Sequence, residues 1–256
     1  MESGRVVGGR YRIGAGGVGD VRFGQDIRSG RPVAVKMLDG APGPAVRLRH
    51  PGIVTVLGTG EHEGRPYLAM ELLDGYTLDD HLLDGGYRAA AVADFGAQIA
   101  EALAVAHRAG LTHGGIGPAR LLLTPAGAVK ILGFGTVAPA PGSDLSALGD
   151  TLDELLARPL PAGPPGELDA LVSQLRDTRG QDPRRTEEFA ARLRRLAAQP
   201  TAAEPAEPAQ PPRRPAAAQR FWIHRRPGRL PLGRALVVVI VAGLIAVTAY
   251  AIAVTS

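Results

Sequence analysis

The chain has 256 residues, of which 45% are hydrophobic, enough to bury one large core or two smaller ones. It contains no cysteine, which excludes disulfides, thiolate metal sites and cysteine nucleophiles and suits a reducing compartment. Residues 1–200 carry 22 basic and 23 acidic side chains, whereas residues 201–234 carry seven arginines against two glutamates. The part expected to fold is nearly neutral, so a nucleic-acid-binding surface is excluded.

A glycine-rich loop follows a short predicted strand near the N-terminus. Residues 14–21 read GAGGVGDV and fit G-x-G-x-x-G-x-V, a loop whose bare backbone can approach phosphate groups. Because the chain contains 34 glycines, this pattern is weak evidence by itself. Residues 32–36, PVAVK, then predict a strand that carries Lys36 inward.

Further strands and helices follow in the order of an α+β domain. Residues 48–54 (LRHPGIV) and 66–75 (PYLAMELLDG) are strand-like, and each contains turn-forming residues. A buried helical stripe is predicted because apolar residues recur three to four positions apart, at Phe95, Ile99, Leu103 and Ala106. Glycine-containing loops and short apolar runs come next, and further helices are predicted over residues 145–156, 167–176 and 187–198.

The composition changes towards the C-terminus. Residues 200–215 are rich in proline and alanine, which predicts an extended linker or, alternatively, a ligand for a proline-binding domain. Residues 235–256 contain no charged side chain, and about 20 helical residues span roughly 30 Å, the thickness of a bilayer core. The alternative is a buried core helix, but such a helix has a polar face and this segment has none. We therefore expect a transmembrane helix.

The charge before this segment predicts its orientation. Four arginines precede it, at Arg225, Arg226, Arg229 and Arg234, and Phe221 and Trp222 are candidate interfacial anchors. Positive charge remains on the cytoplasmic side, so residues 1–234 are expected in the cytoplasm of a bacterium and the C-terminus outside the plasma membrane. Small residues four apart in the segment, at Ala242/Ala246 and Ala249/Ala253, leave a weak homodimer through this helix open.

In order and spacing, the globular segments resemble a bacterial serine/threonine protein kinase of the eukaryotic type. The glycine loop, the V-A-V-K strand, the H-P-x-I-V segment and the hinge at residues 70–73 follow in the family's order. The family's H-R-D-x-K-x-x-N aligns with residues 113–120, and its D-F-G aligns with residues 133–135. The resemblance covers about residues 10–197.

The resemblance implies a bilobal α+β fold. A small β-rich N-lobe with a reduced helix is expected over residues 1–73 and a helical C-lobe over residues 74–198. A linker (residues 199–234) and the transmembrane helix (residues 235–254) complete the expected organisation.

The resemblance also assigns structural and binding roles to individual residues. His113 and Phe134 correspond to side chains that the family packs into an internal hydrophobic column, and Asp144 to the aspartate that hydrogen-bonds the catalytic-loop backbone. The positions that correspond to nucleotide-binding residues lie in the glycine loop, the strands beside it, the hinge and the catalytic loop. They are Gly14, Gly16, Gly19, Val21, Ala34, Lys36, Glu71, Leu73 and Arg120.

The departures from the family pattern concern its chemistry. Family kinases use an aspartate of the catalytic loop as base, and hold magnesium with an asparagine and the D-F-G aspartate. This chain has Gly115, Arg120 and Gly133 at those positions, and Gly117 in place of the loop lysine that contacts the transferred phosphoryl group. Magnesium prefers oxygen ligands and neither expected carboxylate is present, so we expect no metal site. Because the position of the base is also a glycine, we expect no catalytic residues.

Three further losses agree with this expectation. No glutamate occurs between Lys36 and Glu61, so Lys36 should lack the helix-borne partner of the family and be poorly held. The helix itself is replaced by a glycine–proline segment at residues 40–44. Only seven residues separate Gly135 from Ser143, too few for an activation loop and a shelf for substrate, and Gly114 replaces the arginine that would contact an activation-loop phosphate.

Three functional hypotheses follow. The leading one is a membrane-tethered cytoplasmic pseudokinase, a protein-interaction or regulatory module that is not an enzyme and requires no cofactor. A second is a sensor that binds ATP without magnesium, through Arg120 and Lys36, and does not transfer its phosphoryl group. The alternative is a slow or unconventional serine/threonine kinase with a substitute carboxylate near the phosphates. The expected partners are the membrane and an unidentified protein, for which the resemblance suggests envelope or division machinery.

Overall fold

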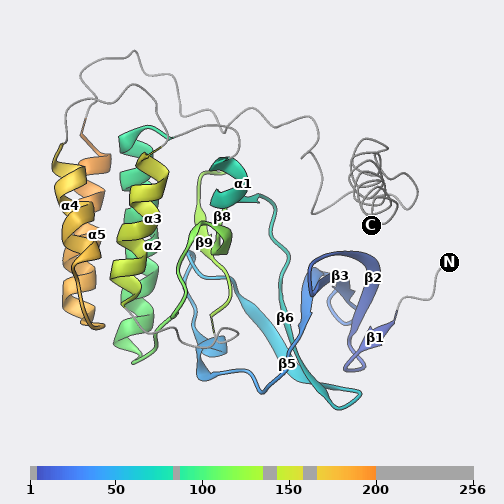
Figure 1. Cartoon of the computed structure of the whole chain (residues 1–256). Helices are drawn as coiled ribbons and strands as arrows, with labels where there is room; N and C mark the ends of the chain where they lie inside the picture. The colour runs from blue at the N-terminus through green and yellow to red at the C-terminus, as the bar shows by residue number, and fades with distance from the viewer. Residues whose placement is uncertain (1–4, 83–86, 135–142, 158–165, 200–256) are drawn as a thin grey trace, which may run out of the picture. The chain divides into compact units, whose positions relative to one another are not determined.

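The computed structural model describes residues 5–82, 87–134, 143–157 and 166–199. The chain divides into two compact units, Met1–Ile223 and His224–Ser256, and the second lies wholly outside the described residues. Strands dominate the described chain up to Glu71, and helices dominate it from Leu78 onwards (Figure 1). The expected α+β order, with the strands first, is therefore present.

A six-stranded antiparallel sheet forms the first part, in the order β1-β2-β3-β4-β6-β5. Its strands are β1 (Val6–Val7), β2 (Tyr11–Val18), β3 (Val21–Asp26), β4 (Pro32–Met37), β5 (Val56–His62) and β6 (Arg65–Glu71). Alternation along β4 buries Val33 and Val35 on one face, with Tyr11 and Tyr67. Lys36 consequently lies on the opposite face.

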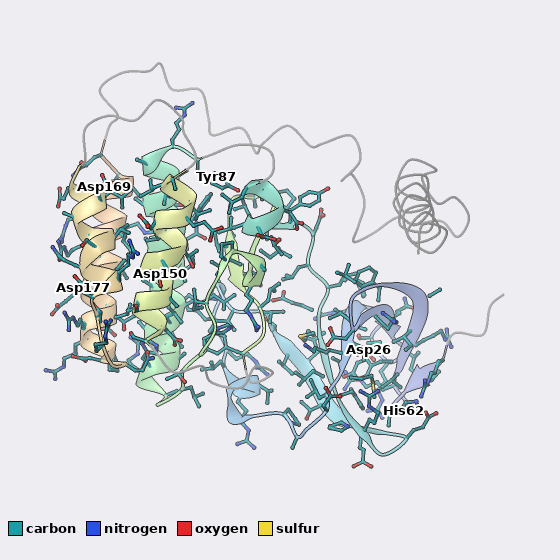
Figure 2. The ribbon with its side chains drawn as sticks, viewed as in Figure 1. Asp26, His62, Tyr87, Asp150, Asp169 and Asp177 are labelled. Atoms are coloured by element: carbon teal, nitrogen blue, oxygen red, sulfur yellow. The ribbon has the colours of Figure 1, made fainter. Side chains whose placement is uncertain are left out.

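Asp26, labelled in Figure 2, closes the hairpin between β3 and β4. Its carboxylate accepts hydrogen bonds from Arg10 at 3.0 and 2.7 Å, from the Arg28 backbone at 3.0 Å and from Ser29 at 2.9 Å. The hydrogen bonds of the Arg10 guanidinium hold the pKa of Asp26 well below its ordinary value.

The prediction of a strand over residues 48–54 is wrong. This segment is a turn in which the Gly52 N–H donates to Nδ1 of His50 at 3.0 Å and the Ile53 N–H donates to the His50 carbonyl at 3.0 Å. Pro51 has no N–H to offer a strand ladder, and only Ile53 forms an isolated bridge, to Ile131. The strand that follows, β5, begins at Val56.

The expected loss of the N-lobe helix is confirmed. Between β4 and β5 the chain forms only a 3₁₀ turn, η1 (Pro44–Arg47). Prolines and glycines dominate residues 40–44, and they favour a loop over an α-helix. Leu38 and Val46 from this segment instead pack on Val56 and Leu68 of the sheet.

The second part contains five helices and a small sheet within the described residues. The helices are α1 (Leu78–Leu82), α2 (Ala89–Arg108), α3 (Asp144–Leu156), α4 (Glu167–Arg176) and α5 (Pro183–Ala197). The small sheet has the order β7-β8-β9, with β7 (Tyr76–Thr77), β8 (Leu121–Leu123) after the turn η2 (Pro118–Arg120), and β9 (Val129–Ile131).

Helix α5 begins four residues earlier than predicted. Asp182 caps it by accepting a hydrogen bond from the Arg184 N–H at 3.0 Å, and Pro183 occupies the first turn, where a missing N–H costs nothing.

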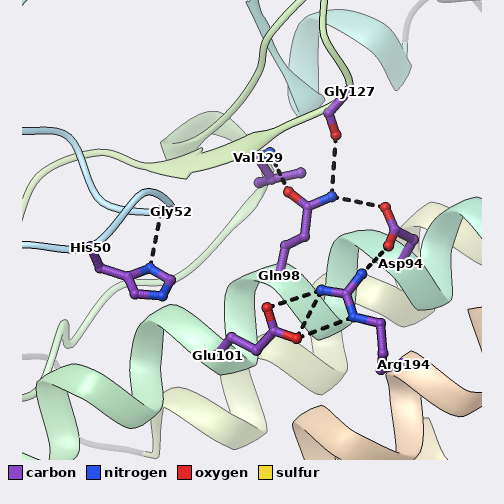
Figure 3. Close-up of polar contacts among 8 residues, drawn as sticks. All are labelled: His50, Gly52, Asp94, Gln98, Glu101, Gly127, Val129 and Arg194. Carbon is purple, nitrogen blue, oxygen red and sulfur yellow. Dashed lines mark hydrogen bonds and ion pairs between the residues drawn. The ribbon is translucent and has the colours of Figure 1, made fainter.

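Helix α2 is the centre of the helical core. Its predicted stripe is confirmed, because Phe95, Ile99, Leu103 and Ala106 are all buried. By length and composition α2 is apolar enough to cross a membrane, but 61% of its apolar window is buried within the domain, so we assign it as a core helix. Arg194 of α5 joins it by contacting Glu101 at 2.8 to 3.1 Å and also Asp94 (Figure 3).

Several predicted segments lie outside the described residues. They are the linker beyond residue 199, the transmembrane helix at residues 235–254, and residues 136–142, where the shortened activation segment is expected. These remain predictions from the sequence.

Candidate functional site

A cavity of about 190 Å³ is lined by residues from both sheets and from the turns beside them. Ten of its fourteen lining residues are apolar, namely Val21, Ala34, Val54, Val56, Leu68, Met70, Leu73, Leu122, Leu132 and Phe134. The others are Lys36, Glu71, Arg120 and Gly133. An apolar cavity with a few convergent charges is the usual form of a small-molecule site.

The structure brings six of the nine predicted binding residues together at this cavity. They are Val21, Ala34, Lys36, Glu71, Leu73 and Arg120. The three glycines do not line it: Gly14 and Gly16 lie in β2, and Gly19 forms the β2–β3 turn with φ of +55°. That positive φ favours glycine at the turn.

Lys36 has an acidic partner that the sequence reading missed. Its Nζ lies 3.0 Å from Oδ2 of Asp20, which follows Gly19 in the β2–β3 turn. The pair forms because Val21 lies directly opposite Lys36 in the β3–β4 ladder, which brings the turn close to the lysine. Lys36 therefore has a partner, which comes from a turn and not from a helix, but the pair is partly exposed to solvent and should hold Lys36 only weakly.

Glu71 is also occupied by an ion pair. Its Oε1 lies 2.5 Å from Nζ of Lys130 on β9, and the Thr55 N–H donates to the same oxygen at 2.8 Å. Burial by itself would raise the pKa of Glu71, but the hydrogen bonds from Lys130 and Thr55 outweigh it and hold that pKa below its ordinary value. The Glu71 carboxylate is thus ionised, and the ammonium group of Lys130 compensates its charge.

Asp144, at the start of α3, organises the loop that precedes η2. Its carboxylate is 1% exposed and accepts hydrogen bonds from the backbone N–H groups of His113 and Gly114 at 2.9 and 2.8 Å. Nε2 of His107 lies 2.9 Å from the same group. Burial opposes ionisation, but these hydrogen bonds prevail and lower the pKa of Asp144.

His113 connects this loop to the segment after β9. Its ring meets Phe134 edge to face with centroids 4.7 Å apart, and its Nε2–H donates to the Leu132 carbonyl at 2.9 Å. Burial lowers the pKa of His113, which keeps the imidazole neutral. The contacts of His113, Phe134 and Asp144 thus hold this loop against α3 and the segment after β9.

Residues 10–147 match the protein kinase domain family. The chain belongs to this family. A probable serine/threonine-protein kinase of Streptomyces coelicolor is 39% identical in an alignment of 159 positions that covers 53% of this chain and 24% of that protein. Serine/threonine-protein kinase PknA of Mycobacterium tuberculosis is 39% identical in an alignment of 156 positions that covers 52% of this chain and 36% of that protein. The chain therefore spans well under half the length of these relatives.

The fold is that of a bilobal protein kinase domain. The crystal structure of the Mycobacterium tuberculosis PknI kinase domain superposes with a TM-score of 0.61, covering 77% of this chain and 99% of that domain at 24% identity.

The positions that align with the family's catalytic groups can now be located. Gly133, which the sequence resemblance aligns with the D-F-G aspartate, lines the cavity with φ of +94°. Gly117 lies in the loop before η2, and a Cβ there would meet no atom within 4 Å, so crowding does not require glycine. Gly115 lies in the same loop.

Arg120, which the sequence resemblance aligns with the family's metal-binding asparagine, lines the cavity. Among the described residues its guanidinium has no hydrogen-bond or ion-pair partner. Arg120 can therefore supply an uncompensated positive charge to a ligand in the cavity.

Carboxylates suitable for a metal are scarce here. Within the described part of the chain, no group of three or more His, Asp or Glu side chains could hold a metal ion. Glu71, the one carboxylate that lines the cavity, is paired with Lys130. This donor set does not fit magnesium, which prefers several carboxylate and water oxygens in octahedral geometry.

Proposed function

We propose that this kinase domain is non-catalytic and acts as a regulatory or protein-interaction module. The observation that carries the proposal is the set of residues at the aligned catalytic positions, Gly115, Gly117, Arg120 and Gly133. Kinase catalysis depends on positioning the phosphates and on neutralising charge with magnesium. Three glycines offer no side chain for either task, and Arg120 presents a cation where a metal ligand is required.

The cavity supports a second element of the proposal, that the domain binds a nucleotide-like ligand without magnesium. Ten apolar side chains can enclose a flat ring, and Arg120 offers donors in a planar fork that suits phosphate oxygens. Binding without transfer would let the ligand set the state of the module while remaining intact.

The alternative is a slow or unconventional serine/threonine kinase. Its support is that the named relatives are serine/threonine-protein kinases, and that Asp20 places a carboxylate beside Lys36. Against it, Asp20 is a single carboxylate that is already paired, and no base aligns with the family's aspartate.

A phosphate-release assay on the full chain separates the two functions. The purified chain is incubated with ATP in magnesium, in manganese and in EDTA. The non-catalytic proposal expects the same background rate in all three conditions. Metal-dependent release that is lost on Lys36→Ala would instead support the kinase.

The membrane tether belongs to this proposal and rests on the sequence. The uncharged segment at residues 235–254, preceded by arginines, supports a single-pass anchor that keeps the kinase domain in the cytoplasm of a bacterium. The module would then act on protein partners at the inner face of the membrane.

A further inference from the structure

The charges around the cavity are almost fully compensated by the chain itself. Glu71 is paired with Lys130 at 2.5 Å, and Lys36 is paired with Asp20 at 3.0 Å. Of the charged side chains that line the cavity, Arg120 alone has no partner of opposite sign among the described residues. The cavity therefore offers a ligand one uncompensated positive charge.

The acidic partner of Lys36 lies in a turn, whereas the family resemblance implies a partner on a helix. Asp20 stands in the β2–β3 turn, next to Val21, which itself lines the cavity opposite Lys36. With the helix between β4 and β5 reduced to η1, the acidic partner approaches from the turn that borders the cavity. A ligand phosphate that contacts Nζ of Lys36 must displace this carboxylate or lie beside it.

We propose that Asp20 is a selectivity residue that favours a ring-bearing ligand of low negative charge, a nucleoside or nucleoside monophosphate, over a nucleoside triphosphate. This inference rests on the proposed binding of a nucleotide-like ligand without magnesium. The apolar lining holds the ring, and Arg120 matches one phosphate. A triphosphate brings several further negative charges that no magnesium neutralises and that Asp20 repels.

The solvent exposure of Asp20 and Lys36 sets how strongly Asp20 can discriminate between ligands of different charge. The Asp20 side chain is 62% exposed and that of Lys36 is 27% exposed, so solvent screens the pair and phosphates can displace it. Asp20 therefore discriminates between ligands and does not close the cavity. For one charge pair at water-like screening, removing the carboxylate should improve triphosphate affinity about five- to tenfold.

The test is isothermal titration calorimetry on the full chain in detergent, with EDTA and low salt, using adenosine, AMP and ATP. The wild-type chain should bind adenosine and AMP at least as tightly as ATP. Asp20→Asn should tighten ATP binding about five- to tenfold and change adenosine affinity by less than about twofold. Arg120→Ala should weaken AMP but not adenosine.

Asp39→Asn is the matched control. It removes the same charge from an exposed pair with Arg65, 3.2 Å apart, which does not line the cavity. It should leave the ratio of ATP to adenosine affinity unchanged.

Three results would overturn the proposal. The wild-type chain could bind ATP more tightly than adenosine and AMP, or Asp20→Asn could weaken ATP binding, which would make Asp20 an orienting partner of Lys36. If none of the three ligands bound to any variant, the proposal that Asp20 selects between ligands would also be overturned. None of these results concerns phosphoryl transfer, so the non-catalytic proposal would fail separately, by metal-dependent phosphate release.

Discussion

Both lysines of this chain form ion pairs in which one member lines the cavity, Lys36 with Asp20 and Lys130 with Glu71, whereas the 27 arginines are spread over the whole sequence. Lysine presents a compact ammonium group on a flexible stem, which fits a narrow space better than a planar guanidinium. Lys36 and Lys130 neutralise Asp20 and Glu71, and thereby leave the charge of the cavity to Arg120. Ligand charge, more than cavity size, should therefore govern what this domain binds.

Asp144 should be the most sensitive acidic residue for stability. Asp144→Ala removes the acceptor of two backbone N–H groups and the partner of His107 in a site that is 1% exposed. We expect a loss of about 3–5 kcal/mol in the free energy of unfolding, measured by urea denaturation. Asp150→Ala on the same helix is the control, because its side chain is 63% exposed and its pair with Arg176 should be worth under about 1 kcal/mol. Equal losses for the two variants would contradict the role given to Asp144.

Stability should fall as the pH is lowered, in two stages. Burial lowers the pKa of His113, so the unfolded chain binds a proton first and stability declines as the pH falls below about 6.5. The pKa values of Asp26, Glu71 and Asp144 are lowered by their partners, so their contributions are lost as the pH falls below about 4. Urea denaturation of the full chain between pH 8 and pH 3 measures both stages. A chain that becomes more stable between pH 7.5 and pH 5 would contradict these assignments.

At the scale of residues, the sequence predicted the roles that depend on spacing along the chain. Lys36, Arg120 and Asp144 follow from motif spacing, and the structure brings the first two to the cavity. The pairs Asp20–Lys36 and Glu71–Lys130 were not predicted, because each depends on how strands distant in sequence are registered. The only sequence signal for the Asp20–Lys36 pair was an acidic residue in the glycine loop, directly before Val21.

At the scale of elements, α3 and α4 approach each other closely at Gly149. Replacing this glycine with alanine should therefore destabilise the domain, although helix propensity alone would predict stabilisation. A Cβ on Gly149 would lie 2.7 Å from the backbone nitrogen of Arg176 and 3.0 Å from Cβ of Leu175. Gly149→Ala should lower the midpoint of thermal unfolding, because overpacking of about 1–3 kcal/mol exceeds the gain of about 1 kcal/mol in propensity.

Gly96→Ala on α2 is the comparison for this effect. Its Cβ would meet side-chain ends of Leu152 and Leu193, which can shift, so its effect should be smaller. A higher midpoint for Gly149→Ala than for the wild-type chain would refute the close packing of α3 on α4.

The predictability of elements depended on their length. Helix α4 begins and ends at the predicted residues, α3 begins one residue before its predicted start, and the stripe predicted on α2 is buried, because these apolar stripes repeat over several turns. The failed strand at residues 48–54 is a short apolar run around Pro51 and Gly52, for which periodicity carries little information. The early start of α5 lies in a polar first turn without a periodic signal.

At the scale of the whole molecule, the bilobal kinase fold was predictable because many weak motifs occur in one order. The family match over residues 10–147 and the likeness to a solved kinase domain both agree with the fold that this order of motifs predicts. Function was less predictable. At Gly115, Gly117 and Gly133 the sequence lacks the side chains of the family pattern, but a missing side chain does not indicate what the domain does instead.

The proposed membrane tether can be tested by truncation. Deletion of residues 235–256 should move the protein from the membrane fraction to the soluble fraction, because burial of about 20 apolar residues outweighs the attraction of the upstream arginines to lipid. Fractionation with and without a high-salt wash measures this. A truncated chain that still sediments with membranes in high salt would rule out the single-helix anchor.

Transfer of radiolabelled phosphate from ATP tests the absence of catalysis most directly. The full chain in detergent is incubated with γ-labelled ATP and a generic protein substrate, in magnesium and in manganese, beside Lys36→Ala as the matched control. The proposed non-catalytic function predicts no label on the chain or on the substrate above the level of Lys36→Ala, because Gly115, Arg120 and Gly133 stand at the positions that the resemblance aligns with the base and the metal ligands. Metal-dependent labelling by the wild-type chain that disappears in Lys36→Ala would contradict it and establish a working kinase.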